Sequence, residues 1–249
     1  MKLVPGWLLL LLLAGCAGGS HTVTQQNQER AQNSAKVHTE LAGLYFERAQ
    51  MGIALSEIDL ALQAARNYAP AYNVRGLIHM SLHEDKEAEE DFQQSLRLDK
   101  ADSEAHNNYG WFLCQRGREQ QSIAHFVAAV KNPLYTTPER AYLNAGLCFQ
   151  KAGNYKDAED FLQRALRVQP DLMQALQALA ELKFSAGDYL AAKKYFVAQK
   201  NENLTAEQLW LAVRIERHVG DGNAEASYAL QLRQRYPEAR ETQLLMHGE

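Results

Sequence analysis

Apolar residues recur at intervals of three and four positions in two successive stretches between Tyr142 and Pro170. This spacing places them on one face of each of two helices. Gly153 interrupts the pattern and Pro170 ends it, as residues that favour turns do. Small side chains at Gly146 and Ala158 leave room for the two helices to approach closely. The pattern therefore predicts a pair of amphipathic helices joined by a tight turn.

The same pattern recurs along most of the chain. The small residue of the first helix returns at intervals of about 34 residues, with a large residue in the last repeat: Ala42, Gly76, Gly110, Gly146, Ala180 and Arg214. The turn is expected at Ala49, Glu84, Gly117, Gly153, Gly187 and Asp221. We therefore expect an all-α fold of about six helix–turn–helix repeats, near residues 35–68, 69–102, 103–138, 139–172, 173–206 and 207–240.

This repeat resembles the tetratricopeptide repeat (TPR), whose unit has about 34 residues. TPR units stack on their neighbours, so the resemblance implies one superhelical TPR solenoid over residues 35–240 rather than two globular domains. Lys183 and Arg217 stand where a Tyr is usual. Such departures are expected near the ends, because a terminal repeat faces solvent on one side. Residues 241–249 are expected to form a polar tail.

The amino-terminal residues predict a secreted lipoprotein. Lys2 precedes an unbroken apolar run from Trp7 to Leu13; this run is too short for a membrane-spanning helix of about 20 residues and fits a secretory signal. The motif LAGC ending at Cys16 resembles a bacterial lipobox, which implies a signal peptide over 1–15 and an acylated Cys16. Ala17, in place of Asp, favours the outer membrane by the same resemblance. The alternative is an ordinary signal peptide with a coincidental Cys.

Residues 16–34 carry the lipidation site and then a polar segment, in which Val23 is the one sizeable apolar side chain. Such a segment buries too little surface to offset the entropy lost on ordering. We therefore expect a flexible tether, with an rms reach of roughly 20–25 Å.

Charge and motifs exclude several functions. The chain has a net charge of −4 and a pI of about 6.1, which gives no electrostatic basis for binding nucleic acid. No motif typical of nucleophilic, metal-assisted or dinucleotide chemistry occurs, so we predict no catalytic residue, no cofactor and no enzyme. His79 and His83 lie four residues apart, but two ligands are too few for a metal site, so we expect an exposed polar pair.

Two further cysteines, Cys114 and Cys148, lie in the first helices of adjacent repeats. Neighbouring first helices pack side by side in TPR folds, and an oxidising periplasm permits a disulfide if the Cα atoms lie about 4.4–6.8 Å apart. Two alternatives stay open. The cysteines could be separate buried thiols, or they could form a thiol oxidoreductase site, although no C-x-x-C motif is present.

A solenoid without catalytic motifs usually binds a partner in its groove. The first helices line the concave side of TPR folds, which gives the candidate groove residues Phe46, Asn73, Leu77, Met80, Asn107, Trp111, Leu143 and Leu147. Asn73 and Asn107 occupy equivalent places and are candidates to hydrogen-bond a peptide backbone, while the apolar residues take its side chains. The alternative is that the aliphatic residues serve core and inter-repeat packing and that solvent covers the two amides.

Two Pro residues and a Thr pair predict a loop over residues 132–138, because proline cannot continue a helix. Its Leu134–Tyr135 pair is either a contact surface or part of a simple connector.

Taken together, the lipobox, the polar segment, the six repeats and the segments NNYGWFLC (Asn107–Cys114) and NPLYTTPERAYLNAGLC (Asn132–Cys148) resemble the PilF/PilW family of type IV pilus biogenesis lipoproteins. This resemblance implies an outer-membrane, periplasm-facing pilotin that helps the secretin to localise or multimerise and contacts secretin subunits and other pilus proteins. It also implies that Cys114 and Cys148 are bridged. The alternative function is that of an outer-membrane TPR lipoprotein scaffold for cell-wall enzymes.

Overall fold

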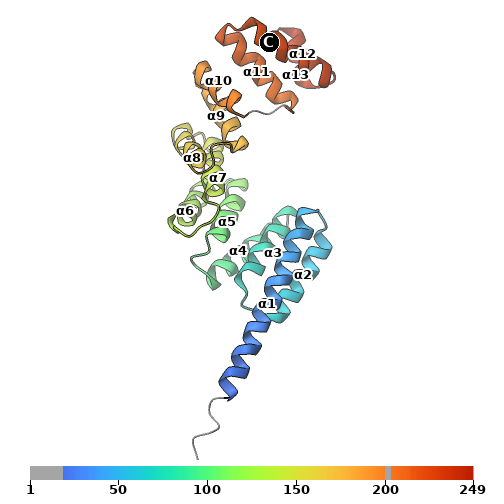
Figure 1. Cartoon of the computed structure of the whole chain (residues 1–249), viewed down its shortest axis with the longest axis vertical. Coiled ribbons are helices and arrows are strands. Elements are labelled where there is room, and N and C mark those ends of the chain that lie inside the picture. Colours follow the sequence, from blue (N-terminus) through green and yellow to red (C-terminus); the bar gives the residue numbers. More distant parts are fainter. Residues whose placement is uncertain (1–18, 200–202, 249) are drawn as a thin grey trace, which may run out of the picture. The chain divides into compact units, whose positions relative to one another are not determined.

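The computed structural model describes residues 19–199 and 203–248, with side chains described from Thr24 onward. Over these residues the backbone forms thirteen helices and no strand (Figure 1). The helices are α1 (Gly19–Glu47), α2 (Met51–Ala64), α3 (Ala69–Ser81), α4 (Asp85–Leu98), α5 (Ser103–Gln115), α6 (Glu119–Lys131), α7 (Pro138–Lys151), α8 (Tyr155–Val168), α9 (Met173–Ser185), α10 (Tyr189–Ala198), α11 (Ala206–Val219), α12 (Gly222–Arg235) and α13 (Arg240–His247). The all-α TPR fold predicted from the repeat is confirmed.

The chain divides into two compact parts, Met1–Lys100 and Ala101–Glu249. We call their described portions the amino-terminal module (α1 to α4) and the carboxy-terminal module (α5 to α13). In each module every odd-numbered helix up to α11 packs on the even-numbered helix that follows it. First helices of successive repeats also touch at three places: α1 with α3, α5 with α7, and α7 with α9. Each module is therefore a stack of TPR pairs with its own core.

The two helices of a pair approach closely because the first helix carries glycine at the crossing point. A Cβ atom built on Gly76 or Gly110 would lie 2.9 Å from the ring of Phe92 or Phe126, respectively. These distances are shorter than real carbon contacts, and the interiors of proteins have little free space to relieve them. Glycine at these positions thus lets a bulky side chain of the second helix pack against bare backbone.

The turns between paired helices share one left-handed residue. Glycine occupies it in four turns, with φ of 73° to 85° at Gly117, Gly153, Gly187 and Gly220. Ala49 and His83 occupy it in the first two repeats, with φ of 57° and 62°.

Two of the predicted turn positions were therefore wrong by one residue, because Glu84 and Asp221 each follow the left-handed residue. The interval between the last two left-handed residues is shorter than the others, since Gly220 comes 33 positions after Gly187. The buried Val213, not Arg214, consequently takes the small-residue place in α11. Because of this shift of one residue, Arg214 lies at a different repeat position, and so on a different face of α11, from the one that we predicted.

The expected coil at residues 17–34 is a further correction, because α1 begins at Gly19 and runs without a break into the first repeat. Residues 24–30 are exposed, so burial does not explain the helix. Gln, Glu and Arg, which make up five of these seven residues, are strong helix formers, and the segment continues a helix that the first repeat has already nucleated. The low hydrophobicity of this segment correctly predicted that its side chains stay exposed. It wrongly predicted that the backbone would be coil, because the backbone is helical.

The expected polar tail at residues 241–249 is also corrected, because α13 packs on α11 and α12. Thr242 and Leu245 are buried, and the Thr242 hydroxyl donates to the Tyr236 carbonyl at 2.6 Å. This short helix covers the last repeat as a terminal cap does in other solenoids.

The loop between α6 and α7 is held against α5. The Tyr135 hydroxyl donates to Glu104 Oε2 and Arg140 Nη1 donates to Glu104 Oε1, each at 3.0 Å. Burial, and then the neighbouring Glu104 carboxylate, raise the pKa of Tyr135, so the phenol keeps its proton and this hydrogen bond. Leu134, at the tip of the loop, is 84% exposed.

Candidate binding groove

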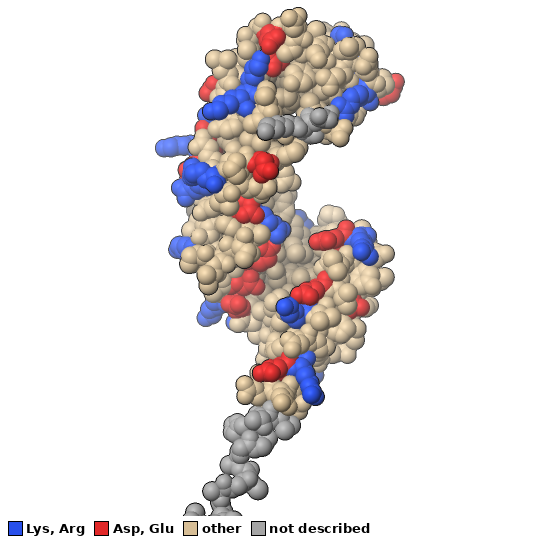
Figure 2. All heavy atoms as spheres, in the orientation of Figure 1, with Lys and Arg blue, Asp and Glu red and all other residues tan. Residues whose placement is uncertain are grey.

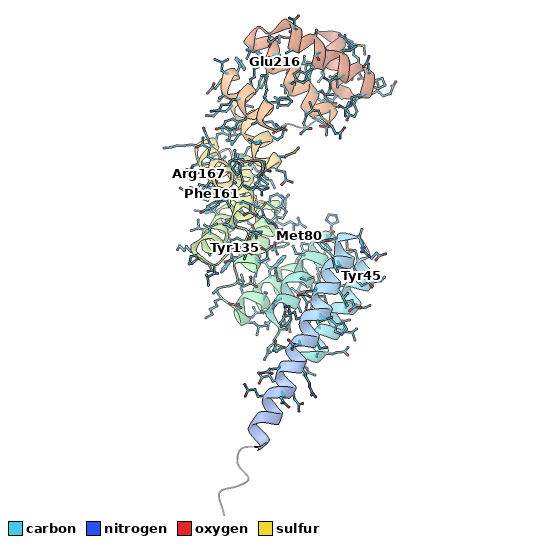
Figure 3. The ribbon with its side chains drawn as sticks, viewed as in Figure 1. Tyr45, Met80, Tyr135, Phe161, Arg167 and Glu216 are labelled. Carbon is cyan, nitrogen blue, oxygen red and sulfur yellow. A yellow bond between two sulfur atoms is a disulfide. The ribbon has the colours of Figure 1, made fainter. Side chains whose placement is uncertain are left out.

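The candidate groove residues of the amino-terminal module differ in exposure. Phe46, Leu77 and Met80 are half-buried, and Phe46 packs against the core of the first repeat (Figure 3 labels Met80). Asn73 is 6% exposed, so its amide does not lie open on the surface as we expected. Phe46, Leu77 and Met80 are therefore the predicted residues of this module that leave apolar area accessible.

In the carboxy-terminal module, two of the predicted groove residues belong to the interior. Asn107 is 1% exposed, and its Oδ1 accepts a hydrogen bond from Asn144 Nδ2 at 2.9 Å. Leu143 is 5% exposed and packs in a cluster with Leu162 and Leu179. Buried amides must find partners within the fold, and Asn107 finds its partner on the next first helix. The interpretation of Asn107 and Leu143 as groove residues is wrong.

Leu147 lines an open depression of about 330 Å³ formed by α7, α9 and α11. The other lining residues come from the first helices of the last two repeats: Met173, Gln174, Gln177, Ala178, Glu181 and Gln208. Sequence reasoning stopped at the fourth repeat and missed them, although the repeat itself contained the signal. Leu147 and Glu181 each lie six residues before the left-handed glycine of their turn, Gly153 and Gly187.

The depression combines apolar and amide surface. Leu147, Met173 and Ala178 provide the apolar part. The Nε2 of Gln177 donates to Glu181 Oε1 at 2.6 Å, and the Oε1 of Gln177 accepts from Gln199 Nε2 at 3.0 Å. Side-chain amides and carboxylates can exchange such bonds for bonds to a peptide backbone. This arrangement can hold an extended polypeptide.

Arg214 stands at the equivalent repeat position on α11, the helix that also contributes Gln208 to the depression. It lies six residues before Gly220, the place that Leu147 and Glu181 occupy in α7 and α9. Its guanidinium carbon is 4.6 Å from the ring centre of Phe184 and 5.6 Å from that of Trp210. Burial lowers the pKa of Arg214, and the carboxylate of Glu181 opposes that shift. Its Nε is buried and has no hydrogen-bond partner among the described residues.

Cys114 and Cys148 form a disulfide between α5 and α7, with Cα atoms 5.9 Å apart. Both side chains are almost completely buried. Lys151 Nζ donates to the Cys114 carbonyl at 2.9 Å, which adds a second link between the two helices. The buried sulfurs argue against a thiol oxidoreductase, because an attacking thiolate needs access to the sulfur. Trp111 is half-buried and packs over the same cluster.

His79 and His83 are not the exposed polar pair that we expected, because the His79 side chain is only 16% exposed, whereas His83 is exposed. His79 Nδ1 lies 2.5 Å from Glu84 Oε2, and its Nε2 lies 3.8 Å from Asp91 Oδ2. His83 is the left-handed residue of the turn. Within the part of the chain that the structure describes, no group of three His, Cys, Asp or Glu residues could hold a metal ion.

Two observations bear on the cell envelope and on charge. Cys16 lies outside the described residues, and no described helix has both the length and the apolar character needed to span a membrane. Acidic and basic side chains are interspersed on the face that Figure 2 shows. This mixture agrees with the small net charge of the chain.

Comparison with known proteins identifies the repeats. The tetratricopeptide repeat family model matches residues 69–102 and 139–172, the ranges expected for the second and fourth repeats. The chain is 24% identical to the type IV pilus assembly protein PilF of Pseudomonas aeruginosa over 238 residues, which cover 95% of this chain and 94% of PilF.

Two solved structures are similar over most of their length. The crystal structure of PilW, described as a widely conserved type IV pilus biogenesis factor, is 34% identical, with a TM-score of 0.77 over 85% of this chain and 98% of PilW. The structure of PilF from Pseudomonas aeruginosa has a TM-score of 0.81 at 23% identity and covers 89% of this chain and 99% of that one. The likeness to PilW thus extends to sequence as well as fold.

Proposed function

The chain belongs to the PilF/PilW family of TPR proteins of type IV pilus biogenesis, and from this we propose that it is a non-catalytic, outer-membrane lipoprotein adaptor that helps the pilus secretin to localise or multimerise. The observation that carries the proposal is the 34% identity to PilW over 98% of that protein's solved chain. Secretin subunits are the proposed partner, and other pilus proteins are further candidates.

The stacked first helices support a binding role. In the carboxy-terminal module, α7, α9 and α11 line a depression that combines apolar side chains with amides. In the amino-terminal module, Leu77 and Met80 leave apolar surface half-exposed. Grooves of this kind bind peptide segments through apolar anchors and side-chain hydrogen bonds.

The proposed anchor is an acylated Cys16 facing the periplasm. Stable attachment requires more than one acyl chain, each buried methylene contributing about 0.8 kcal/mol. The helical stretch from Gly19 to Ser34 then acts as a spacer of about 24 Å, at 1.5 Å per residue. Confinement of adaptor and secretin subunits to one membrane raises their effective concentration and so favours ring assembly.

The anchor is tested with two single substitutions in cells. Cys16→Ala removes the acylation site, and we expect the protein to leave the membrane fraction and secretin multimers to decrease in the outer membrane, as measured by native gel electrophoresis. Ala17→Asp keeps the lipid but is expected to hold the protein at the inner membrane. If multimers form normally in both variants, outer-membrane anchoring has no part in the function.

A deletion strain separates this function from a scaffold for cell-wall enzymes. Loss of pili with normal cell shape supports the pilus role. Altered septation with intact pili would show instead that the chain organises cell-wall enzymes.

A further inference from the structure

We propose that the groove of the last three repeats binds an extended peptide that carries an internal Asp or Glu side chain, and that Arg214 receives this carboxylate. The proposal rests on the proposed binding function and assigns the chemistry of the partner at one end of the depression. Its basis is the row of equivalent positions Leu147, Glu181 and Arg214, which we call the groove row.

The register of α11 places Arg214 on the groove row. Leu147 and Glu181 both line the depression. Leu147 lies six residues before Gly153, Glu181 lies six residues before Gly187, and Arg214 lies six residues before Gly220. Equivalent positions of stacked TPR helices face the same side of the stack. The row therefore runs from an apolar side chain through a carboxylate to a guanidinium.

Among the described residues the guanidinium of Arg214 has ring contacts but no hydrogen-bond acceptor. Phe184 and Trp210 cover it from two sides, and its buried Nε lacks a hydrogen-bond partner among the described residues. Glu181 accepts from Gln177 at 2.6 Å, and no ion pair joins it to Arg214 within the described part of the chain. A partly desolvated cation without an acceptor is costly, and a bound carboxylate would satisfy it.

The donor set favours a side-chain carboxylate over a chain end. Proteins capture terminal carboxylates in nests of backbone N–H groups, whereas Arg214 offers one planar guanidinium from the middle of α11, beyond the first turn of that helix. A guanidinium between aromatic rings keeps a fixed plane and can donate two parallel hydrogen bonds to one carboxylate. The amides of Gln174, Gln177 and Gln208 can hold the backbone on the way to Leu147.

The distance between the helices that carry the groove row predicts how far apart the two recognised side chains lie in the partner sequence. Packed helices lie about 8–10 Å apart, so two steps from α7 to α11 span about 16–20 Å. An extended chain covers this length in about five or six residues. The ligand should therefore carry an apolar side chain and an acidic side chain about five or six positions apart.

The test is selection of a random dodecapeptide library, displayed on phage, against the full chain in detergent micelles. One library presents the peptide internally and a second presents it with a free carboxyl terminus. We expect the internal library to enrich sequences with Asp or Glu at a constant distance from Leu, Ile, Met or Phe. Enrichment of neutral peptides, of peptides bound only through a free terminus, or of nothing at all would overturn the proposal.

The best selected peptide is then synthesised with its acidic residue or with the matching amide, and binding is measured by fluorescence anisotropy. Replacing the carboxylate should weaken binding roughly ten- to a hundredfold. Arg214→Gln should lower the affinity for the acidic peptide by a similar factor and leave the affinity for the amide peptide unchanged. Arg214→Lys should restore part of the affinity, because it keeps the charge without the planar fork.

Arg167→Gln is the matched control. Arg167 is an exposed cation on α8, a second helix of the same module (Figure 3), and does not line the depression. Its loss should leave both affinities unchanged. If Arg214→Gln lowers thermal stability but not peptide affinity, Arg214 only packs against its rings and the proposal is wrong. Failure of the proposed function is distinguishable, since it appears in the Cys16→Ala strain and not in peptide binding.

Discussion

At the scale of single residues, the turns show where this chain departs from the best local choice. An L-residue in the left-handed conformation costs about 1–2 kcal/mol relative to its preferred backbone, whereas glycine adopts this conformation readily. Ala49 and His83 occupy it at φ of 57° and 62°, while the other four turns use glycine. The amino-terminal module is therefore less stable than it would be with glycine at these two turn positions.

Exchanging these residues should move stability in opposite directions. We expect Ala49→Gly to raise the free energy of unfolding by about 1 kcal/mol and Gly153→Ala to lower it by about 1 kcal/mol, as measured by urea denaturation. The space around Gly153 is open, so the loss would come from the backbone alone. Gly52→Ala, in the helical backbone of α2 with equally open space, should stabilise by up to about 1 kcal/mol; a loss there would contradict this account.

A second residue-scale prediction concerns His125. Burial, and then the neighbouring His106, lower the pKa of His125 to about 4; the two Nδ1 atoms lie 2.9 Å apart, and the ring of Tyr109 lies 4.6 Å away. The unfolded chain therefore takes up this proton first, and stability that is complete above about pH 6.5 should fall as the pH drops toward 4. His125→Gln should flatten this part of a plot of melting temperature against pH. An unchanged slope would show that other groups cause the loss.

At the scale of helices, the pairs depend on glycine at the crossing point. The test is Gly110→Ala, whose new Cβ would lie 2.9 Å from the Phe126 ring and 3.2 Å from the Ser122 carbonyl. Overpacking of this kind costs about 1–3 kcal/mol, which denaturation of the full chain would reveal. Adding Phe126→Leu should recover part of the loss, because it removes the ring but not the carbonyl contact. Gly43→Ala, on α1 with open space around it, is the control that should not destabilise.

Periodicity predicted the helices well because paired TPR helices bury one face each, and burial imposes the spacing of apolar residues. It failed where no burial acts, as over residues 19–34 of α1. It also failed where the spacing of the repeats changes. Gly220 comes one position early, so the periodicity assigned Arg214 to the small-residue position and did not predict it as a groove residue. Asn107 and Leu143 looked like surface residues, since a repeat position alone does not reveal the hydrogen bond to Asn144 or the packing on Leu162.

At the scale of the whole molecule, two compact modules imply that a stabilising link in one need not affect the other. The Cys114–Cys148 disulfide closes a sequence separation of 34 residues within the carboxy-terminal module. By loop entropy, such a link contributes about 3–4 kcal/mol. The double variant Cys114→Ser/Cys148→Ser should therefore lower the melting of one module and not the other.

Differential scanning calorimetry, with intrinsic fluorescence to follow Trp111 and Trp210, would separate the two transitions. Both tryptophans belong to the carboxy-terminal module, so the fluorescence transition should shift to lower temperature. The transition of α1 to α4 should stay in place. A uniform shift of all signals would mean that the modules unfold as one body.

The unbroken course of α1 has a mechanical consequence. It runs as one helix from Gly19 to Glu47 and packs on α2 and α3 along its second half. Tension applied at its amino-terminal end would act along the helix axis and load the contact with α2 in shear, so that Ala35 and Ala42 resist it together. If a coil were joined to the same repeat, tension would instead pull the start of the helix away from α2, and the contacts between the two helices would break one after another.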